Sequence, residues 1–332
     1  MHLRLMSKQP VASLSLDLDN QWSYMKTHGD EGWESYPTYL PLLVPRVIEA
    51  LRDANLRITF FIVGQDAALE KNHAALRMIT DAGHEVGNHS FRHEPWLHLY
   101  SEAELDREIE DAEVAIETAT GKRPNCFRGP GFSLSRTVLK VLTKRGYVCD
   151  ASTFPTFLGP LARMYYFMTS KLDKAELEQR DQLFGKMQDG LRPLKPYRIQ
   201  TEVGSLIEIP VTTMPVLKIP IHVSYLLYLS VFAPWLAKLY FRFALAMCKL
   251  TGVQLSLLLH PLDFMGCDDN IPEMAFFPAM NLTVSRKLKF LRYVFRTLNQ
   301  QFTIVPMQEH AKAIAEQAKA VPMKHPKAIA LP

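Results

Sequence analysis

The chain has 332 residues, of which 48% are hydrophobic and 22% are charged. This balance excludes a disordered or collagen-like chain, and the length fits one large α/β barrel or a catalytic domain with an insertion. The net charge of +4 argues against a dedicated nucleic-acid-binding protein. Four widely separated cysteines without a Cys-x-x-Cys pair argue against a disulfide scaffold or a cysteine zinc site.

Short apolar runs alternate with amphipathic segments along the chain. The predicted strands are 11–16, 58–63, 84–88, 125–128, 147–150, 206–211, 255–259 and 302–305. The predicted helices are 42–51, 67–81, 101–119, 133–145, 286–299 and 307–319. Strands that alternate with helices predict a mainly parallel sheet, either open or closed into a barrel.

Two segments depart from this alternation. The interval 155–205 has helical patterns at 161–172 and 175–187, so we expect a mainly helical insertion there. An apolar helical segment follows at about 222–251, and its most apolar stretch is too short to span a bilayer. We expect a single catalytic domain over residues 1–320 and a loose tail over 321–332.

The N-terminal apolar run before Asp17 is too short for a secretory signal and leads directly into the first predicted strand. We therefore expect a cytoplasmic protein whose cysteines are reduced.

Polar side chains follow five of the predicted strands. Ligands gather at the carboxyl ends of strands in barrel-like α/β folds. Two histidines and an aspartate can form an open zinc site, while a second carboxylate and another histidine supply a general base and a general acid. This set predicts metal-assisted hydrolysis. Its members are Asp17, Asp19, His89, His93, Arg128, Asp150 and His260.

Each signature also has a structural interpretation. The aspartate pair fits a solvated strand end, Arg128 and Asp150 fit structural ion pairs, and His260 fits a buried core histidine. Only their order along the chain, each at the end of a predicted strand, favours catalysis.

That order resembles the polysaccharide deacetylase family (the NodB-homology fold, carbohydrate esterase family 4). The matching motifs are the aspartate pair Asp17 and Asp19, His89-Ser90-Phe91-Arg92-His93, Arg128-Gly129-Pro130, Asp150, and Leu257-Leu258-Leu259-His260. The resemblance covers residues 11 to about 306 apart from the insertion. It implies a distorted (β/α) barrel of about seven strands.

The resemblance also implies a role for each motif residue. Asp17 would be the general base, and Asp19, His89 and His93 would hold zinc or another divalent transition metal. The further roles would be orientation of Asp17 by Arg128, an oxyanion contact from the backbone near Gly131, a general acid in His260 oriented by Asp150, and an acyl pocket lined by Leu257.

This chain departs from the family pattern at three places. Leu18 separates the two aspartates, which leaves open which of them binds the metal. Phe154 stands where the family usually has tryptophan, and Gly131 stands where an aromatic residue is common, which opens room for a bulkier substrate. Trp22, in the loop after the first strand, is a candidate for stacking on a sugar ring.

The positive charge of the chain is concentrated in one interval. Residues 161–252 hold 12 Lys/Arg and 7 Asp/Glu, and apolar and aromatic residues are interleaved with them. This pattern favours a surface helix on an anionic membrane and an amino-sugar substrate linked to polyprenyl phosphate. Packing against the barrel or a partner subunit remains the alternative.

The expected reaction is N-deacetylation or deformylation of an amino sugar in a glycan or lipid-linked saccharide. Two other functions fit the same fold. One is a cyclic amide or ureide hydrolase with little metal dependence, and the other is an inactive carbohydrate- or lipid-binding module. No nucleic-acid partner is expected, and the sequence leaves the oligomeric state open.

Overall fold

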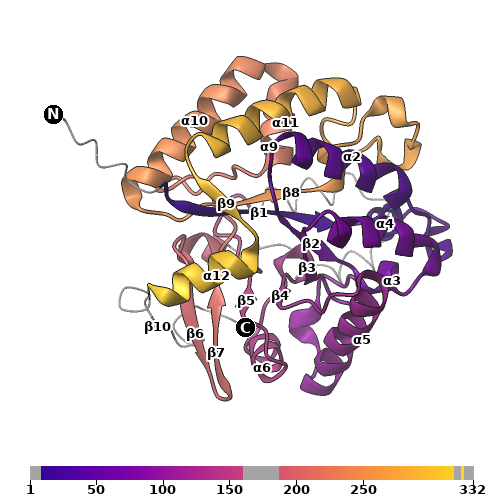
Figure 1. The fold of residues 1–332 in the computed structure, drawn as a ribbon, viewed down its shortest axis with the longest axis vertical. Coiled ribbons are helices and arrows are strands. Elements are labelled where there is room, and N and C mark those ends of the chain that lie inside the picture. The colour runs from indigo at the N-terminus through magenta and orange to yellow at the C-terminus, as the bar shows by residue number, and fades with distance from the viewer. Residues whose placement is uncertain (1–8, 160–186, 318–322, 325–332) are drawn as a thin grey trace.

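A curled sheet forms the centre of the molecule, with helices around it (Figure 1). The computed structural model describes residues 9–159, 187–317 and 323–324. Its strands are β1 (Val11–Leu18), β2 (Thr59–Ile62), β3 (Glu85–Asn88), β4 (Cys126–Phe127), β5 (Cys149–Asp150), β6 (Tyr197–Thr201), β7 (Gly204–Glu208), β8 (Ser256–Leu259), β9 (Thr303–Val305) and β10 (Met323–Lys324). Its α-helices are α1 (Gln21–His28), α2 (Leu40–Asp53), α3 (Gly64–Ala67), α4 (Glu70–Asp81), α5 (Glu102–Thr120), α6 (Arg136–Lys144), α9 (Val223–Phe232), α10 (Pro234–Thr251), α11 (Val284–Asn299) and α12 (Met307–Glu316).

The strands follow the order β10-β6-β7-β5-β4-β3-β2-β1-β8, and β9 pairs with β1. All neighbours from β7 to β8 are parallel, whereas β6 runs antiparallel to β7. Just after β7, the Thr212 amide donates to the Ser256 carbonyl of β8 at 2.9 Å. The two ends of the parallel array therefore approach each other, which confirms the predicted distorted barrel of about seven strands.

The central strand β1 separates two apolar layers because its side chains alternate between faces. Leu14 and Leu16 pack into the large outer cluster with residues of α2 and α11. Ser15 and Asp17 point to the inner face, where both contact Arg128. At the end where the strands begin, α12 fills the interior with Met307, Ala311 and Ile314. The opposite end of the barrel carries the polar side chains.

Most predicted elements are present with small shifts in their ends. Helix α5 begins at the expected capping box, in which the Ser101 hydroxyl accepts from the Glu104 amide and the Glu104 carboxylate accepts from the Ser101 amide. Helix α1 was not predicted; Asn20 caps it by accepting from the Gln21 amide at 2.8 Å. The apolar segment at 222–251 folds as α9 and α10.

The predicted insertion differs where it can be compared. The helical patterns at 161–172 and 175–187 lie outside the described residues, apart from residue 187. The described end of the interval forms strand β6 of a hairpin with β7, which was not predicted. Pairing with the sheet edge stabilises β6, and the sequence pattern around it does not reveal that edge.

The prediction that all four cysteines are reduced is also wrong. Cys126 and Cys149 lie opposite each other on β4 and β5, with Cα atoms 4.9 Å apart, and form a disulfide. Their sequence separation of 23 gave no sign of this, because only the sheet register brings them together. Cys248 is free and buried, and Cys267 is free and exposed.

None of the described helices has the length and apolar character that crossing a bilayer requires.

Candidate active site

The polar strand ends predicted from the sequence meet at one end of the barrel. Leu16 of β1 pairs with Leu259 of β8, so continuing the register places Asp17 beside His260. On the other side of β1, strand β2 leads to β3, after which His89 and His93 follow. The carboxyl ends of parallel strands thus bring together residues that are far apart in the sequence.

Asp19, His89 and His93 form a cluster that could hold a metal ion. Asp19 Oδ1 lies 3.0 Å from His93 Nε2 and 3.3 Å from His89 Nε2. The three ligand atoms all lie within 4.8 Å of one another. Asp19 Oδ1 is buried and has no hydrogen-bond donor in the described part of the chain. Two imidazoles and an otherwise unpartnered carboxylate oxygen fit a divalent transition metal.

The surroundings of His89 fix its orientation. Its Nδ1 lies 2.6 Å from the Arg128 carbonyl oxygen, which requires the proton on Nδ1 and leaves Nε2 free as a ligand atom. Burial alone would raise the pKa of Asp19, but the two histidines beside it lower that pKa far below its usual value. The carboxylate is therefore ionised and ready to bind a cation.

The segment from His89 to His93 is a tight loop held by buried polar groups. Ser90 and His93 have φ angles of 61° and 55°, in the left-handed region. Glu108 of α5 accepts from the amides of Phe91 and Arg92 at 3.0 and 2.6 Å. These bonds turn both histidine rings toward Asp19. The two histidines, four residues apart, therefore approach Asp19 from a loop and not from one face of a helix.

Asp17 pairs with the fully buried Arg128. Arg128 Nη1 donates to Asp17 Oδ1 at 2.7 Å and to Ser15 Oγ at 2.9 Å. The guanidinium lies over the Phe61 ring, 4.5 Å from its centroid. A side chain at Gly87 would collide with that ring, since an added Cβ would lie 2.5 Å from it. The predicted contact between Arg128 and Asp17 is thus confirmed by the hydrogen bond from Nη1 to Oδ1.

His260 has a different partner from the one we expected. Its Nδ1 lies 2.9 Å from the Ser224 hydroxyl of α9, and its backbone amide donates to Asp263 at 2.8 Å. The prediction that Asp150 orients His260 is wrong. Asp150 is buried and accepts from the Ser152 hydroxyl at 2.6 Å.

Asp150 instead forms a buried acidic pair with Glu208, its neighbour across β5 and β7. Burial raises the pKa of both carboxyls, and the nearby Asp150 raises that of Glu208 further. The two carboxyls lie opposite each other in the sheet and are buried, so Asp150 belongs to the interior of the sheet.

An aromatic wall extends from His260. Phe154 stacks on Phe132 at a centroid distance of 4.8 Å and meets the edge of His222 at 5.7 Å. The His222 ring lies 5.9 Å from that of His260. Gly131, with φ of 57°, is exposed in the turn before this wall. Phe154 therefore belongs to this wall and Gly131 lies next to it. Their binding of a substrate stays a prediction.

Two predicted substrate-binding residues are packed elsewhere. Leu257 is 1% exposed and belongs to the outer cluster with Leu14, because alternation along β8 turns it to the face opposite His260. Trp22 is also 1% exposed, and its Nε1 donates to buried Asp66 at 2.9 Å. Neither side chain offers a face to a substrate, so both predictions are corrected.

Tyr24 is a candidate site residue that was not predicted from the sequence. Its hydroxyl is buried without a hydrogen-bond partner in the described residues. Burial raises the pKa of Tyr24 well above its usual value, and Asp19, Asp263 and Asp17 add to the shift because they lie close enough to act on it. Tyr24 of α1 therefore keeps its proton and is a candidate hydrogen-bond donor. The asparagine cap that starts α1 directly after Asp19 was the available signal.

The comparison with known families agrees with this arrangement. The model of the polysaccharide deacetylase family matches residues 30–149. This range includes His89, His93 and Arg128. Over these residues the chain is similar to the polysaccharide deacetylases.

Two curated relatives extend the similarity. A peptidoglycan deacetylase of Helicobacter pylori is 27% identical over 183 residues, which cover 53% of this chain and 60% of the relative. A peptidoglycan-N-acetylglucosamine deacetylase of Bacillus cereus is 28% identical over 143 residues, covering 42% and 61%. The chain thus spans about 60% of the length of these relatives.

A solved structure supports the fold of this chain. A putative polysaccharide deacetylase from Mycobacterium smegmatis aligns over 97% of this chain and 95% of its own, with a TM-score of 0.63 and 19% identity. At that identity the likeness shows the barrel fold alone.

Proposed function

We propose that this protein is a metal-dependent hydrolase that removes an acyl group, acetyl or formyl, from the nitrogen of an amino sugar. One observation carries the proposal: a base paired with arginine, Asp17–Arg128, lies two residues from the Asp19–His89–His93 cluster. Related proteins named peptidoglycan deacetylases support the reaction class.

The residues of the chain divide the proton transfers between them. Asp17 takes a proton from the attacking water, and Arg128 holds the carboxylate in position. Asp19, His89 and His93 would hold the ion, which we infer to be zinc. When bound, the ion supplies Lewis-acid polarisation of the acyl oxygen and lowers the pKa of water.

The leaving amine receives its proton on the other side of the site. His260 donates this proton, and Ser224 fixes the plane of its ring through Nδ1. The Tyr24 hydroxyl, which has no hydrogen-bond partner among the described residues, donates a hydrogen bond to the oxygen on which negative charge develops, together with the backbone near Gly131. The acyl group leaves as a carboxylate, and water supplies its second oxygen.

We infer further that the amino sugar is carried on a lipid, such as polyprenyl phosphate. Helix α9 starts at the site, where Ser224 contacts His260, and ends at Phe232, whose side chain is 72% exposed. A substrate whose sugar occupies the aromatic wall could therefore extend its apolar part along α9. Such a substrate requires that the protein reach a membrane surface.

Two other functions are less well supported. A cyclic amide hydrolase with little metal dependence would not need the convergence of Asp19, His89 and His93. An inactive binding module would not need a paired base and a positioned acid, which Asp17 and His260 retain.

A deacylation assay tests the proposal. The purified protein, with its zinc content measured, is incubated with N-acetylated sugars presented as chitin oligomers, nucleotide sugars and polyprenyl-phosphate sugars. We expect zinc-dependent release of a free amine, which is abolished in Asp17→Asn and in His260→Ala while folding is retained. Activity that survives in both variants would disprove the assigned roles.

A further inference from the structure

Helices α9 and α10 expose a row of large apolar side chains. Trp235, Leu239 and Phe243 repeat every four residues and therefore lie on one side of α10. Trp235 is 69% exposed and Leu250 is 81% exposed. Isolated surface apolar residues are ordinary, but a contiguous row of this size marks an interaction surface. This apolar stripe consists of Phe232, Trp235, Leu236, Leu239, Phe243 and Leu250.

Basic residues run alongside the apolar stripe. Lys238, Arg242 and Lys249 share one side of α10 because they are spaced four and seven residues apart. The facing helix α11 presents Lys289, Arg292 and Arg296, and neither helix contains an acidic residue.

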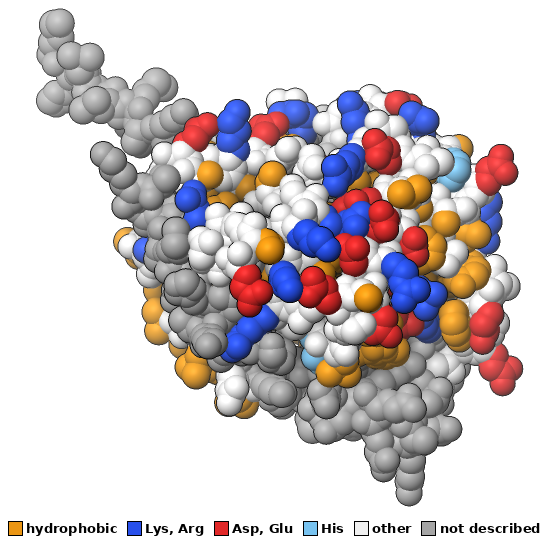
Figure 2. Space-filling model, turned by 90° about the horizontal axis from the view of Figure 1, so that it is seen from below, with side chains coloured by type: hydrophobic (Ala, Val, Ile, Leu, Met, Phe, Trp, Pro, Cys, Tyr) orange, Lys and Arg blue, Asp and Glu red, His pale blue; other side chains and the backbone are white. Residues whose placement is uncertain are grey.

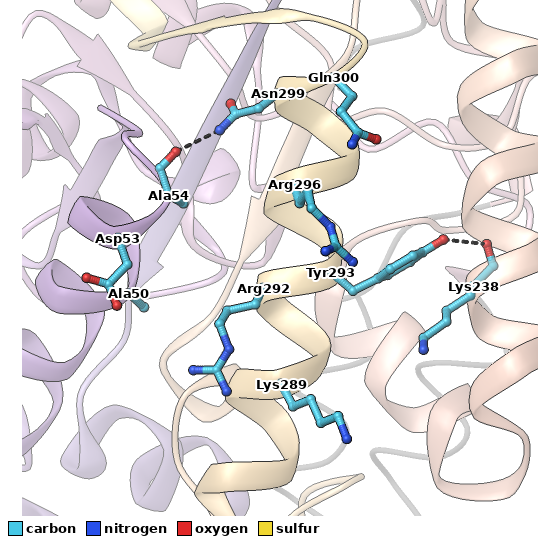
Figure 3. Close-up of a pocket in the computed structure, with 10 residues that line it drawn as sticks. All are labelled: Ala50, Asp53, Ala54, Lys238, Lys289, Arg292, Tyr293, Arg296, Asn299 and Gln300. Carbon is cyan, nitrogen blue, oxygen red and sulfur yellow. Dashed lines mark hydrogen bonds between the residues drawn. The ribbon is translucent and has the colours of Figure 1, made fainter.

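Between α10, α11 and the end of α2 lies an open cavity of about 650 Å³, the basic groove. Figure 3 shows Lys289, Arg292 and Arg296 in a column along α11, with Lys238 on the facing helix and Asp53 on the far side. The Tyr293 hydroxyl bridges the helices by donating to the Lys238 carbonyl at 3.4 Å. Asp53 is the single acidic residue in its lining.

The charges of the basic groove are unbalanced within the described structure. In the described ranges, Lys289, Arg292 and Arg296 take part in no ion pair with a carboxylate. The opposite side of the molecule, which Figure 2 shows from below, has basic and acidic side chains interspersed. An excess of one sign beside an apolar row therefore distinguishes the surface of α10 and α11.

We propose that the apolar stripe and the basic groove together form a docking surface for an anionic phospholipid membrane. Trp235, Phe232 and Leu239 enter the boundary between headgroups and acyl chains, where tryptophan is favoured. The groove receives phosphate groups of the headgroups, which complement its cations. Either feature alone would fit other partners, but an apolar row bordered by cations matches the two layers of an anionic bilayer surface.

Docking through this surface would also place the active site relative to the membrane. Helix α9 carries Phe232 of the stripe at one end and Ser224, the partner of His260, at the other. Docking would hold the entrance to the site near the membrane. The surface itself does not depend on the proposed chemistry, because none of its residues lies in the site.

Vesicle co-sedimentation tests the docking surface. The full chain is mixed with vesicles of phosphatidylcholine alone or of phosphatidylcholine with phosphatidylglycerol, at low and high salt. We expect binding that requires phosphatidylglycerol and weakens with salt, because surface charges are screened. Free inorganic phosphate at the same ionic strength should not compete more than chloride does.

Matched variants locate the surface. Since each basic residue near an anionic membrane contributes about 1 kcal/mol, Arg292→Gln with Arg296→Gln should weaken binding by roughly 30-fold. Trp235→Ser with Leu239→Ser should abolish detectable binding. The charge control is Arg136→Gln with Lys144→Gln on α6, and the apolar control is Leu99→Ser with Val114→Ser. Both controls should bind like the unaltered protein.

Several outcomes would overturn the proposal. They are binding that does not depend on phosphatidylglycerol, equal losses in test and control variants, or a stable dimer in sedimentation velocity that Trp235→Ser dissociates, which would assign the stripe to a second copy. Zinc-dependent activity on a soluble sugar should be unchanged in the surface variants. Failure of docking and failure of the catalytic proposal are therefore distinguishable.

Discussion

The Ser224 hydroxyl lies 2.9 Å from Nδ1 of His260, at the first turn of α9. This contact fixes the ring of the proposed general acid from a helix that belongs to the apolar segment and not to the barrel strands. Asp150, which we expected to orient His260, pairs with the buried carboxyl of Glu208. The proposed general acid is thus positioned by the same helix that reaches the exposed apolar stripe.

Removing the Ser224 hydroxyl should slow turnover. A neutral hydrogen bond contributes about 1 kcal/mol, so Ser224→Ala should lower kcat roughly fivefold with little change in KM, and Ser224→Thr should restore it in part. Ser230→Ala is the control, since Ser230 lies on the same helix and donates to the Leu227 carbonyl. An unchanged kcat in Ser224→Ala would contradict the positioning role.

Asp19→Asn should remove the metal. Loss of an outer-shell partner alone weakens metal binding by about 10- to 100-fold, so losing a direct ligand should exceed that range. Zinc content after dialysis, together with the shift in Tm on adding zinc, measures the effect. His73→Gln is the control, because His73 contacts the Ala67 carbonyl away from the cluster. Equal zinc content in Asp19→Asn and the control would place the metal elsewhere.

Arg128→Met should destabilise the fold strongly. It leaves the Asp17 carboxylate buried without its partner, and such changes cost about 3–5 kcal/mol in the free energy of unfolding. Adding Asp17→Asn should recover part of that loss, as urea unfolding would show. Arg57→Gln breaks an exposed pair with Glu309 and should cost less than about 1 kcal/mol. A loss in Arg128→Met as small as in this control would argue that water reaches Asp17.

Tyr24→Phe should lower activity without lowering stability. The hydroxyl has no partner to lose in the described structure, so the free energy of unfolding should hold or rise slightly. We expect kcat to fall at least about tenfold if the hydroxyl stabilises developing charge. Tyr240→Phe should lower the free energy of unfolding and leave kcat unchanged, because the Tyr240 hydroxyl donates to the Pro220 carbonyl at 2.9 Å. A purely structural Tyr24 would leave kcat unchanged.

His310 should make stability depend on pH. Burial lowers the pKa of His310 from 6.5 to about 4, so the folded state favours the neutral ring. Its stabilising contribution is complete above pH 6.5 and is lost as the pH falls toward 4, since the unfolded chain then binds more protons. Between about pH 7 and pH 5 this loss amounts to roughly 2 kcal/mol.

Urea unfolding at both pH values, compared with His310→Gln, isolates the contribution of His310. The variant should lose less stability on acidification than the unaltered protein does. An equal loss in both would assign the acid sensitivity to other groups.

The amino-acid sequence determined the order of strands and helices and the residues at the strand ends. Apolar runs and caps are local signals, so β1, α5 and the carboxyl ends carrying Asp17, His89 and His260 could be predicted from them. That the aspartate pair, His89 and His93 gather at one end could be predicted because parallel strands place their ends at one edge. The choice of Asp19 over Asp17 as their partner was left open by the sequence and appears only in the structure.

The tertiary structure alone decided which groups touch. Sheet register paired Cys126 with Cys149 and turned Leu257 away from the site, and packing buried Trp22 against Asp66. It also gave His260 the Ser224 hydroxyl as its partner and brought α11 beside α10. These contacts depend on the relative placement of distant segments, which packing of the whole chain sets and local patterns do not contain.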